Sequence, residues 1–335
     1  MSTSSTPPSP QLYFDTINAF HKTAALKAAL DLGLFTAIGK TPSTATEVAA
    51  KCQCPERGIR ILCDYLTIQG FLTKEGSHYA LTLDSATFLD RNSPAYLGPS
   101  ADFLLAPELV ESFHDLAATI RRGTPEVKST TPEHPIWLEF ARAMGPMMLG
   151  PARAITGLVP IETDRETKIL DISASHGAYG IAFAQKNPRL HLVALDWAPV
   201  LAITEENARA AGLADRFSKI AGDAFTVDLG DDYDVVLVPN FLHHFNPADC
   251  TRFLRRVHAA LRPGGRVVVV EFVPNEDRVS PPGSATFGLV MLSSTPEGDA
   301  YPFSEYSKML GDAGFHGFAL HPLLPTTASA VIATK

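Results

Sequence analysis

The amino-acid sequence predicts an α/β protein in which a doubly wound sheet, mostly parallel with an antiparallel last strand, follows a mainly helical winged-helix domain. Two observations lead to this prediction. From residue 168 onward, short apolar runs alternate with helical patterns, which is typical of parallel strands joined by right-handed crossovers. Residues 12–100 instead show helical patterns followed by two short strand patterns around a glycine-containing turn.

Length and composition narrow the classes of protein that fit. The chain has 335 residues, 45% hydrophobic and 19% charged, which suits a soluble protein with two full cores. The net charge of −8 disfavours a broad nucleic-acid surface, and no apolar run is long enough for a transmembrane helix. Residues 1–11 are rich in Ser, Thr and Pro without a signal-peptide pattern, so we expect a disordered tail on a cytoplasmic protein. The four cysteines lack zinc-ligand spacing, so we expect free thiols and no metal.

The N-terminal elements fit a winged helix. Thr44 and Glu47 form a capping box that opens a helix, and glycine follows the last helical pattern. The expected elements are a helix over 26–35, a short helix from the capping box to residue 51, a helix over 56–69 and a hairpin over 71–82.

A winged helix also raises the alternative of a DNA-binding regulator. The helix that would enter the DNA groove, residues 56–69, carries as many acidic as basic side chains. Phosphate contacts dominate DNA affinity, so a neutral helix argues against this alternative. We therefore favour a domain that buries apolar helices against a partner subunit.

The rest of the chain divides into a helical connection and the sheet. Over residues 101–155 we expect helices at 101–123 and 136–149, separated by a connection at 124–135 that is rich in Pro, Thr and Glu. Residues 156–335 form the predicted α/β domain. Its expected strands are 168–172, 190–195, 217–221, 233–238, 266–273, 316–323 and 329–334, with helices over 178–185, 202–212, 247–261 and 304–313.

The first strand and the turn after it have the shape of a nucleotide-binding turn. The strand contains Asp171, and the turn runs through Ser173 and Ser175 to Gly177, where a helix begins. Serine and alanine stand where such turns usually have glycine. We expect this turn to be sterically allowed if the serines keep negative φ angles.

Acids follow the next two strands. Asp196 ends the second strand at the offset expected for an acid that accepts hydrogen bonds from ribose hydroxyls, although a surface loop acid is the alternative. Asp223 follows the third strand and could bond an adenine amine, with Phe225 packed nearby. A simple turn stabilised by Asp223 explains that segment equally well.

Two adjacent histidines follow the apolar strand at 233–238. Ligands of open α/β sheets bind at the carboxyl ends of strands, so His243 or His244 should reach the cleft. Neighbouring side chains point in different directions, and we expect only one of the two to enter. Glu271 follows four valines at another strand end, where it could fix the tautomer of a histidine or simply be exposed.

In these segments the chain resembles the class I S-adenosylmethionine-dependent small-molecule O-methyltransferases, which have a Rossmann-like domain and an N-terminal winged-helix dimerisation domain. The family includes caffeate-type and bacterial polyketide-tailoring enzymes. Its first motif resembles residues 170–177, and its H-D-W motif resembles residues 243–245. The resemblance implies that His243 is the general base and that Glu271 is one of two flanking acids. The second acid would fall at Ala300, so only the neighbouring Asp299 could replace it.

The resemblance also implies the ligands and partners. The cofactor would be S-adenosyl-L-methionine, with S-adenosyl-L-homocysteine as product and no metal. The cofactor-binding residues implied are Asp171, Ser173, Ser175, Gly177, Asp196, Trp197, Asp223, Ala224, Phe225, Asn240 and Phe245. The residues implied for a flat, apolar, aromatic acceptor are Trp137, Phe140, Met144, Met291 and Leu292. A homodimer in secondary metabolism, without nucleic acid or membrane partners, is expected.

Other reactions on the same scaffold remain open from the sequence. The missing second acid and the altered turn are compatible with methylation of carbon or with a non-methylating reaction that uses the same cofactor. A cofactor-binding protein without catalysis is a further alternative, besides the DNA-binding regulator.

Overall fold

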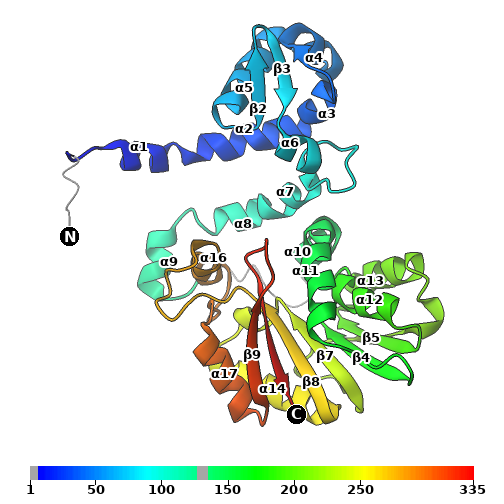
Figure 1. Cartoon of the computed structure of the whole chain (residues 1–335). Coiled ribbons are helices and arrows are strands. Elements are labelled where there is room, and N and C mark those ends of the chain that lie inside the picture. The colour runs from blue at the N-terminus through cyan, green and yellow to red at the C-terminus, as the bar shows by residue number, and fades with distance from the viewer. Residues whose placement is uncertain (1–6, 127–134) are drawn as a thin grey trace. The chain divides into compact units, whose positions relative to one another are not determined.

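The computed structural model describes residues 7–126 and 135–335, and these separate into two compact units, Met1–Ala101 and Asp102–Lys335 (Figure 1). Most of the predicted tail at 1–11 and of the predicted connection at 124–135 therefore lies outside the described residues. Each unit is considered by itself below.

The N-terminal unit combines helices with a small antiparallel sheet in the order β1-β3-β2. Its elements are α1 (Gln11–Ile17), α2 (Ala19–Asp31), α3 (Leu34–Ile38), β1 (Ser43–Thr44), α4 (Ala45–Cys52), α5 (Glu56–Ile68), β2 (Leu72–Glu75), β3 (His78–Leu81) and α6 (Leu83–Phe88). The capping box is present, because Thr44 and Glu47 exchange hydrogen bonds at the start of α4. The helix predicted over 26–35 is instead divided at Gly33, whose φ of 64° ends α2 and allows α3 to begin.

The C-terminal unit is built on a seven-stranded sheet with the order β6-β5-β4-β7-β8-β10-β9. The strands are β4 (Thr167–Ile172), β5 (Leu190–Asp196), β6 (Phe217–Ala221), β7 (Tyr233–Pro239), β8 (Leu261–Glu271), β9 (His316–Pro322) and β10 (Ser329–Thr334). The first five pair in parallel and the last two are antiparallel, which confirms the predicted fold class.

Helices cover both faces of this sheet, and successive residues of one strand enter different cores. In β4, Leu170 packs in the core with α14 (Pro247–Ala260) and α17 (Phe303–Asp312), whereas Ile169 packs in the core with α11 (Gly145–Leu158) and α12 (Ala178–Lys186). Strand order reverses between β4 and β7, and such a switch point opens a crevice at the carboxyl edge of the sheet.

Proline interrupts both helices predicted before the sheet. Residues 101–123 form parts of three helices, α7 (Gly98–Leu104), α8 (Pro107–Glu111) and α9 (Leu116–Arg122). The segment predicted as one helix over 136–149 is divided into α10 (Ile136–Ala143) and α11 (Gly145–Leu158). Pro107 and Pro146 lie in the first turn of a new helix, where the missing N–H has no intrahelical partner to lose.

Two boundaries and one connection also differ from the prediction. Helix α13 (Ala198–Ala210) begins at residue 198 rather than 202, directly after Trp197. Strand β8 begins at residue 261 rather than 266. The long connection after β8 contains two helices that the sequence analysis did not predict, α15 (Pro282–Ala285) and α16 (Phe287–Ser294).

Candidate active site

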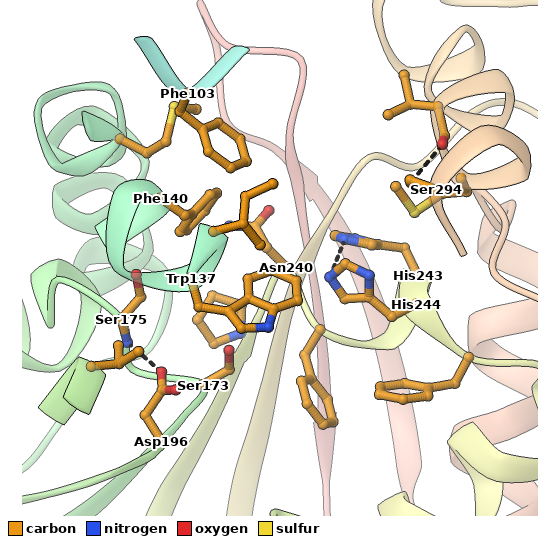
Figure 2. A pocket seen from close by; sticks show the side chains of 18 of the residues that line it. Phe103, Trp137, Phe140, Ser173, Ser175, Asp196, Asn240, His243, His244 and Ser294 are labelled. Atoms are coloured by element: carbon orange, nitrogen blue, oxygen red, sulfur yellow. Dashed lines mark hydrogen bonds between the residues drawn. The ribbon is translucent and has the colours of Figure 1, made fainter. Parts of the chain in front are cut away.

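A cavity of about 970 Å³ lies at the carboxyl ends of β4, β5, β6, β7 and β8, within the C-terminal unit. One part is formed by the loops that follow these strands. The other part is formed by apolar side chains from α7, α8, α10, α11 and α16 (Figure 2). The crevice expected at the switch point is therefore a pocket with a polar and an apolar half.

Asp171 organises the turn after β4 but does not line the cavity. Its carboxyl group is fully buried and accepts the backbone N–H of Gly180 at 2.9 Å. A Cβ at Gly180 would approach this carboxyl to 2.9 Å and Leu192 to 2.4 Å, so any larger residue would force these buried side chains to shift. Burial raises the pKa of Asp171 to about 8. Gly177, which caps α12 with a φ of 76°, is likewise behind the cavity wall.

The two serines of the turn have positive φ angles, which corrects the expectation of negative ones. Ser173 and Ser175 both have a φ of 53°, a left-handed conformation that costs a residue with a Cβ roughly 1–2 kcal/mol. Contacts from β5 and α13 hold the turn in place. The Ser175 N–H donates to Asp196 at 2.8 Å, and the Thr204 hydroxyl donates to the Ser175 carbonyl at 2.5 Å. The buried hydroxyl of Ser175 has no partner among the described residues.

Asp196 and Asp223 both line the cavity. The Asp196 carboxylate accepts the N–H groups of Ser175 and Trp197 and keeps free lone pairs, and burial raises its pKa to about 6. Asp223 accepts the N–H of Phe225 at 2.9 Å, which stabilises its own turn, yet it also faces the cavity. The two interpretations of Asp223 are thus compatible.

An aromatic box lies beside Asp223. The ring of Phe225 is 4.8 Å from that of Phe245 and 6.0 Å from that of Phe241, measured between centroids. Trp197, Ala224 and Asn240 complete the predicted cofactor side of the cavity. Asn240 adopts a φ of 51° where β7 ends, and its backbone N–H donates to Val270 at 2.8 Å.

His243 is held by Glu271. The imidazole Nδ1 lies 2.5 Å from Glu271 Oε2, and the other carboxylate oxygen accepts the backbone N–H groups of Phe241, Leu242 and His243. Glu271 is completely buried and His243 is 4% exposed. A carboxylate next to Nδ1 makes that nitrogen the donor, so Nε2 carries the lone pair and faces the cavity. The structure thus brings together the pair that the sequence analysis proposed.

His244 also lines the cavity, so the expectation that only one histidine enters is wrong. The residues Leu242–His244 form a 3-10 turn, and the Nε2 atoms of the two imidazoles lie 3.1 Å apart (Figure 2). The ring of Trp137 meets His244 edge-on at 5.6 Å. Burial and the neighbouring His243 hold the pKa of His244 well below its usual value, so this imidazole is neutral.

Asp299 does not replace the missing second acid. Its carboxylate pairs with Arg278 at 3.0 Å and accepts the N–H of Ala300, and it is absent from the described cavity lining. Only the backbone of Asp299 approaches the site, where its N–H donates to the carbonyl of His243 at 3.0 Å. Glu271 is therefore the acid that orients the histidine.

The apolar half contains most of the predicted acceptor residues. Trp137, Phe140, Met144 and Met291 line it, whereas Leu292 points into a neighbouring hollow on the other side of α16. Sequence reasoning missed several members of this wall, among them Phe103, Phe113, Met148 and Phe287. Phe287 stacks on Phe272 at 4.0 Å and meets the His243 ring edge-on at 4.9 Å.

His176 was also missed, although it lies inside the first motif. Its Nδ1 accepts the N–H of Ala178 at 3.0 Å, and burial lowers its pKa to about 4. The ring is therefore neutral with its proton on Nε2, and it lines the cavity beside Phe140. Its position directly before Gly177 was the signal that could have identified it.

The polar half fits a nucleoside that carries an amino-acid group. Carboxylates at Asp196 and Asp223 can accept hydrogen bonds from hydroxyl and amine groups, and the aromatic box offers an apolar surface for a flat base. The Ser175 hydroxyl and the His176 N–H can donate to a carboxylate. Over residues 7–126 and 135–335, no cluster of side chains could hold a metal ion. In the same ranges, no helix is long and apolar enough to span a membrane.

Comparisons with known proteins agree with this geometry. Residues 156–316 match the O-methyltransferase domain, and residues 14–91 match the O-methyltransferase dimerisation domain. The crystal structure of a candidate O-methyltransferase from Nostoc punctiforme PCC 73102 is 50% identical, with a TM-score of 0.95, and the match covers 98% of this chain and 100% of that one.

Two more distant proteins match over nearly the whole chain. The 3-hydroxy-5-methyl-1-naphthoate 3-O-methyltransferase of Streptomyces sahachiroi is 27% identical over 320 residues, covering 93% of this chain and 92% of that protein. Human N-acetylserotonin methyltransferase, solved in complex with S-adenosylmethionine, has a TM-score of 0.83 at 22% identity, covering 100% of this chain and 99% of that one.

Proposed function

The chain belongs to the S-adenosylmethionine-dependent O-methyltransferase family, and we propose that it methylates a hydroxyl of a small aromatic acceptor with His243 as the general base. One observation carries this proposal. The Nδ1 of His243 is fixed on a buried carboxylate, and its Nε2 lone pair faces the cavity where the polar and apolar halves meet. A hydroxyl bound in the apolar half would compete for that lone pair with the neighbouring His244.

The polar half is proposed to hold the cofactor. When bound, S-adenosylmethionine supplies an electrophilic methyl group on a cationic sulfur. Asp196 accepts the ribose hydroxyls, as an acid at this position does in other nucleotide-binding α/β sheets. Asp223 and the aromatic box of Phe225, Phe241 and Phe245 take the adenine. The turn at residues 173–177, with His176, binds the amino-acid end.

The apolar half is proposed to hold a flat aromatic ring. Trp137, Phe140 and Phe103 present aromatic faces and edges, while Met144 and Met291 supply flexible thioethers that adapt to a ring. The Streptomyces relative acts on the hydroxyl of a naphthoate, an acceptor of this type. Because these walls offer few polar groups, the reacting hydroxyl would be oriented chiefly by the histidines.

Glu271 is proposed to make proton removal feasible. A phenol with a pKa near 10 and an imidazole near 6.5 leave a proton transfer that is uphill by about 3 to 4 pKa units in water. In the buried site, the carboxylate of Glu271 stabilises the positive charge that arrives on His243, and its three backbone N–H contacts keep it from moving. Positioning next to the electrophile supplies the remainder.

We also propose that the protein works as a homodimer. The dimerisation domain is present, and α1 with the start of α2 exposes a row of large apolar side chains. Leu12 is 79% exposed, Tyr13 63%, Ile17 56% and Phe20 64%. Several large apolar side chains exposed along one short segment are typical of a face that a second subunit covers. The four thiols are unpaired in the structure, which supports a reducing, cytoplasmic setting.

Product analysis tests the reaction directly. The purified enzyme would be incubated with S-adenosylmethionine carrying a ¹³C-labelled methyl group and with hydroxylated naphthalenes. We expect products with a labelled methoxy carbon, identified by mass and ¹³C NMR. A labelled methyl group on a ring carbon would show C-methylation instead of O-methylation. Products without the label would contradict methyl transfer altogether.

A further inference from the structure

The contact between the two histidines has a consequence for the choice of acceptor, which rests on the proposed role of His243. The 3-10 turn Leu242–His244 brings both imidazoles to the same wall of the cavity, with their Nε2 atoms 3.1 Å apart. A single hydrogen can lie between two nitrogens at this distance.

The position of that hydrogen follows from the surrounding contacts. The Nδ1–H of His243 donates to the carboxylate of Glu271, so the Nε2 of a neutral His243 is an acceptor. His244 must then donate its own Nε2–H, which leaves its Nδ1 without a proton. This agrees with the His244 Nδ1 atom, which is buried and has no partner within the described residues. If His243 donated from Nε2 to His244 instead, the Nδ1–H of His244 would be a buried donor without an acceptor. The Nε2 of His243 would then carry a proton and could not act as the base.

The reacting hydroxyl must displace this hydrogen bond, because it needs the same lone pair on His243. The His244 N–H then loses its partner in a pocket bounded by Trp137, Phe287 and other apolar side chains. The oxygen that attacks the methyl group is a poor replacement, since donating to it would withdraw the electron density that the reaction uses. A second oxygen next to the reacting hydroxyl would satisfy the N–H without this cost.

We propose that His244 is a specificity-determining residue that selects acceptors with an oxygen adjacent to the reacting hydroxyl, such as a catechol or an ortho-hydroxy ketone. His243 accepts the hydrogen of the reacting hydroxyl, while His244 donates to the adjacent oxygen. The donor and the acceptor of the protein are side by side, and they match an acceptor molecule that presents the complementary pair at similar spacing. An isolated phenol satisfies only one of them.

Binding to the enzyme saturated with S-adenosylhomocysteine tests the proposal without turnover. The probes are naphthalene-2,3-diol and 2-naphthol, and the dissociation constants are measured by calorimetry. After allowance for the two equivalent hydroxyls of the diol, we expect it to bind about tenfold more tightly, the size of one neutral hydrogen bond. His244→Phe should remove this preference because it weakens the binding of the diol, while 2-naphthol should bind with unchanged or higher affinity. His244→Gln, which keeps an N–H near the Nε2 position, should retain part of it.

Two outcomes would overturn the proposal. One is equal affinity for both probes in the parent enzyme. The other is that His244→Phe lowers the affinities for the diol and for 2-naphthol by the same factor, as a loss of packing would. His316→Phe, at an exposed histidine on β9, is the matched control and should change neither affinity.

The tautomers provide a second, spectroscopic test. In ¹⁵N-histidine-labelled enzyme, NMR should show His243 protonated at Nδ1 and His244 protonated at Nε2, and the diol should perturb both rings. A His244 protonated at Nδ1 would contradict the proposed donor. These results are separable from the proposed function: activity retained in His243→Ala would reject His243 as the base, whereas an unchanged diol preference in His244→Phe would reject only the role of His244.

Discussion

Replacement of Glu271 by glutamine is the perturbation whose effect can be followed most closely from the structure. One carboxylate oxygen accepts three backbone N–H groups at 2.8 to 3.3 Å, and the other accepts the Nδ1–H of His243 at 2.5 Å. Glutamine has one oxygen and one NH₂ group, so it can serve only one of these two sets. The side chain is fully buried, and water cannot replace the lost contact.

Both orientations of the introduced amide are unfavourable, for different reasons. With its oxygen toward the backbone, the glutamine side chain would place an N–H against His243 Nδ1, shift the proton to Nε2 and remove the base. With its oxygen toward His243, it would set an NH₂ group against three N–H donors, at a cost of about 1–3 kcal/mol for each buried donor left unsatisfied. Since general-base catalysis contributes about 10²–10⁴ in rate, we expect kcat to fall by a factor in this range.

The assay is steady-state methyl transfer at saturating S-adenosylmethionine, together with thermal unfolding of the same samples. Glu206→Gln, at an exposed residue on α13, controls for the loss of one negative charge and should behave like the parent enzyme. If Glu271→Gln kept both kcat within about threefold and the melting temperature, the carboxylate would be orienting neither His243 nor the turn that carries it.

Two further predictions concern the turn after β4. Burial raises the pKa of Asp171 to about 8, so the folded protein retains a proton that the unfolded chain loses near pH 4; the free energy of unfolding should therefore fall as pH rises from about 4 to about 8. Asp171→Asn should flatten that slope in thermal unfolding measured across this range, and an unchanged slope would mean that another group causes it. Ser175 has a φ of 53°, so Ser175→Val should destabilise the protein by about 2 kcal/mol, whereas Ser175→Gly should stay within about 1 kcal/mol of the parent. Urea unfolding of the two variants measures the difference, and equal stabilities would contradict a strained turn.

The elements of the fold that depend on local signals could be predicted from the sequence. The capping box of α4, the alternation of apolar runs and the polar residues that end β5, β7 and β8 are all local patterns. These patterns placed His243 and Glu271 at strand ends that share one edge of the sheet, but they left Glu271 open between orienting a histidine and being exposed, and the structure shows the first. The prolines that divide the helices before the sheet are also visible in the sequence. The prediction of two long helices there overlooked them.

Features that depend on distant contacts could not be predicted. The positive φ angles of Ser173 and Ser175 are imposed by partners on β5 and α13. Asp299 turns away from the site because Arg278 lies in reach of its carboxylate. The entry of both histidines reflects the tight 3-10 turn that carries them, which no apolar pattern indicates. Leu292 misses the pocket because the face that α16 presents is set by tertiary packing.

The most direct test of the central claim is the comparison of turnover and cofactor affinity in His243→Ala. The side chain lies at the junction of the two halves of the cavity, and its hydrogen bonds go to Glu271 and His244 rather than to the residues proposed to hold the cofactor. Methyl transfer should fall by at least about 10², while the dissociation constant for S-adenosylmethionine, measured by calorimetry, should stay within about threefold of the parent value. Unchanged turnover with intact cofactor binding would show that His243 is not the base.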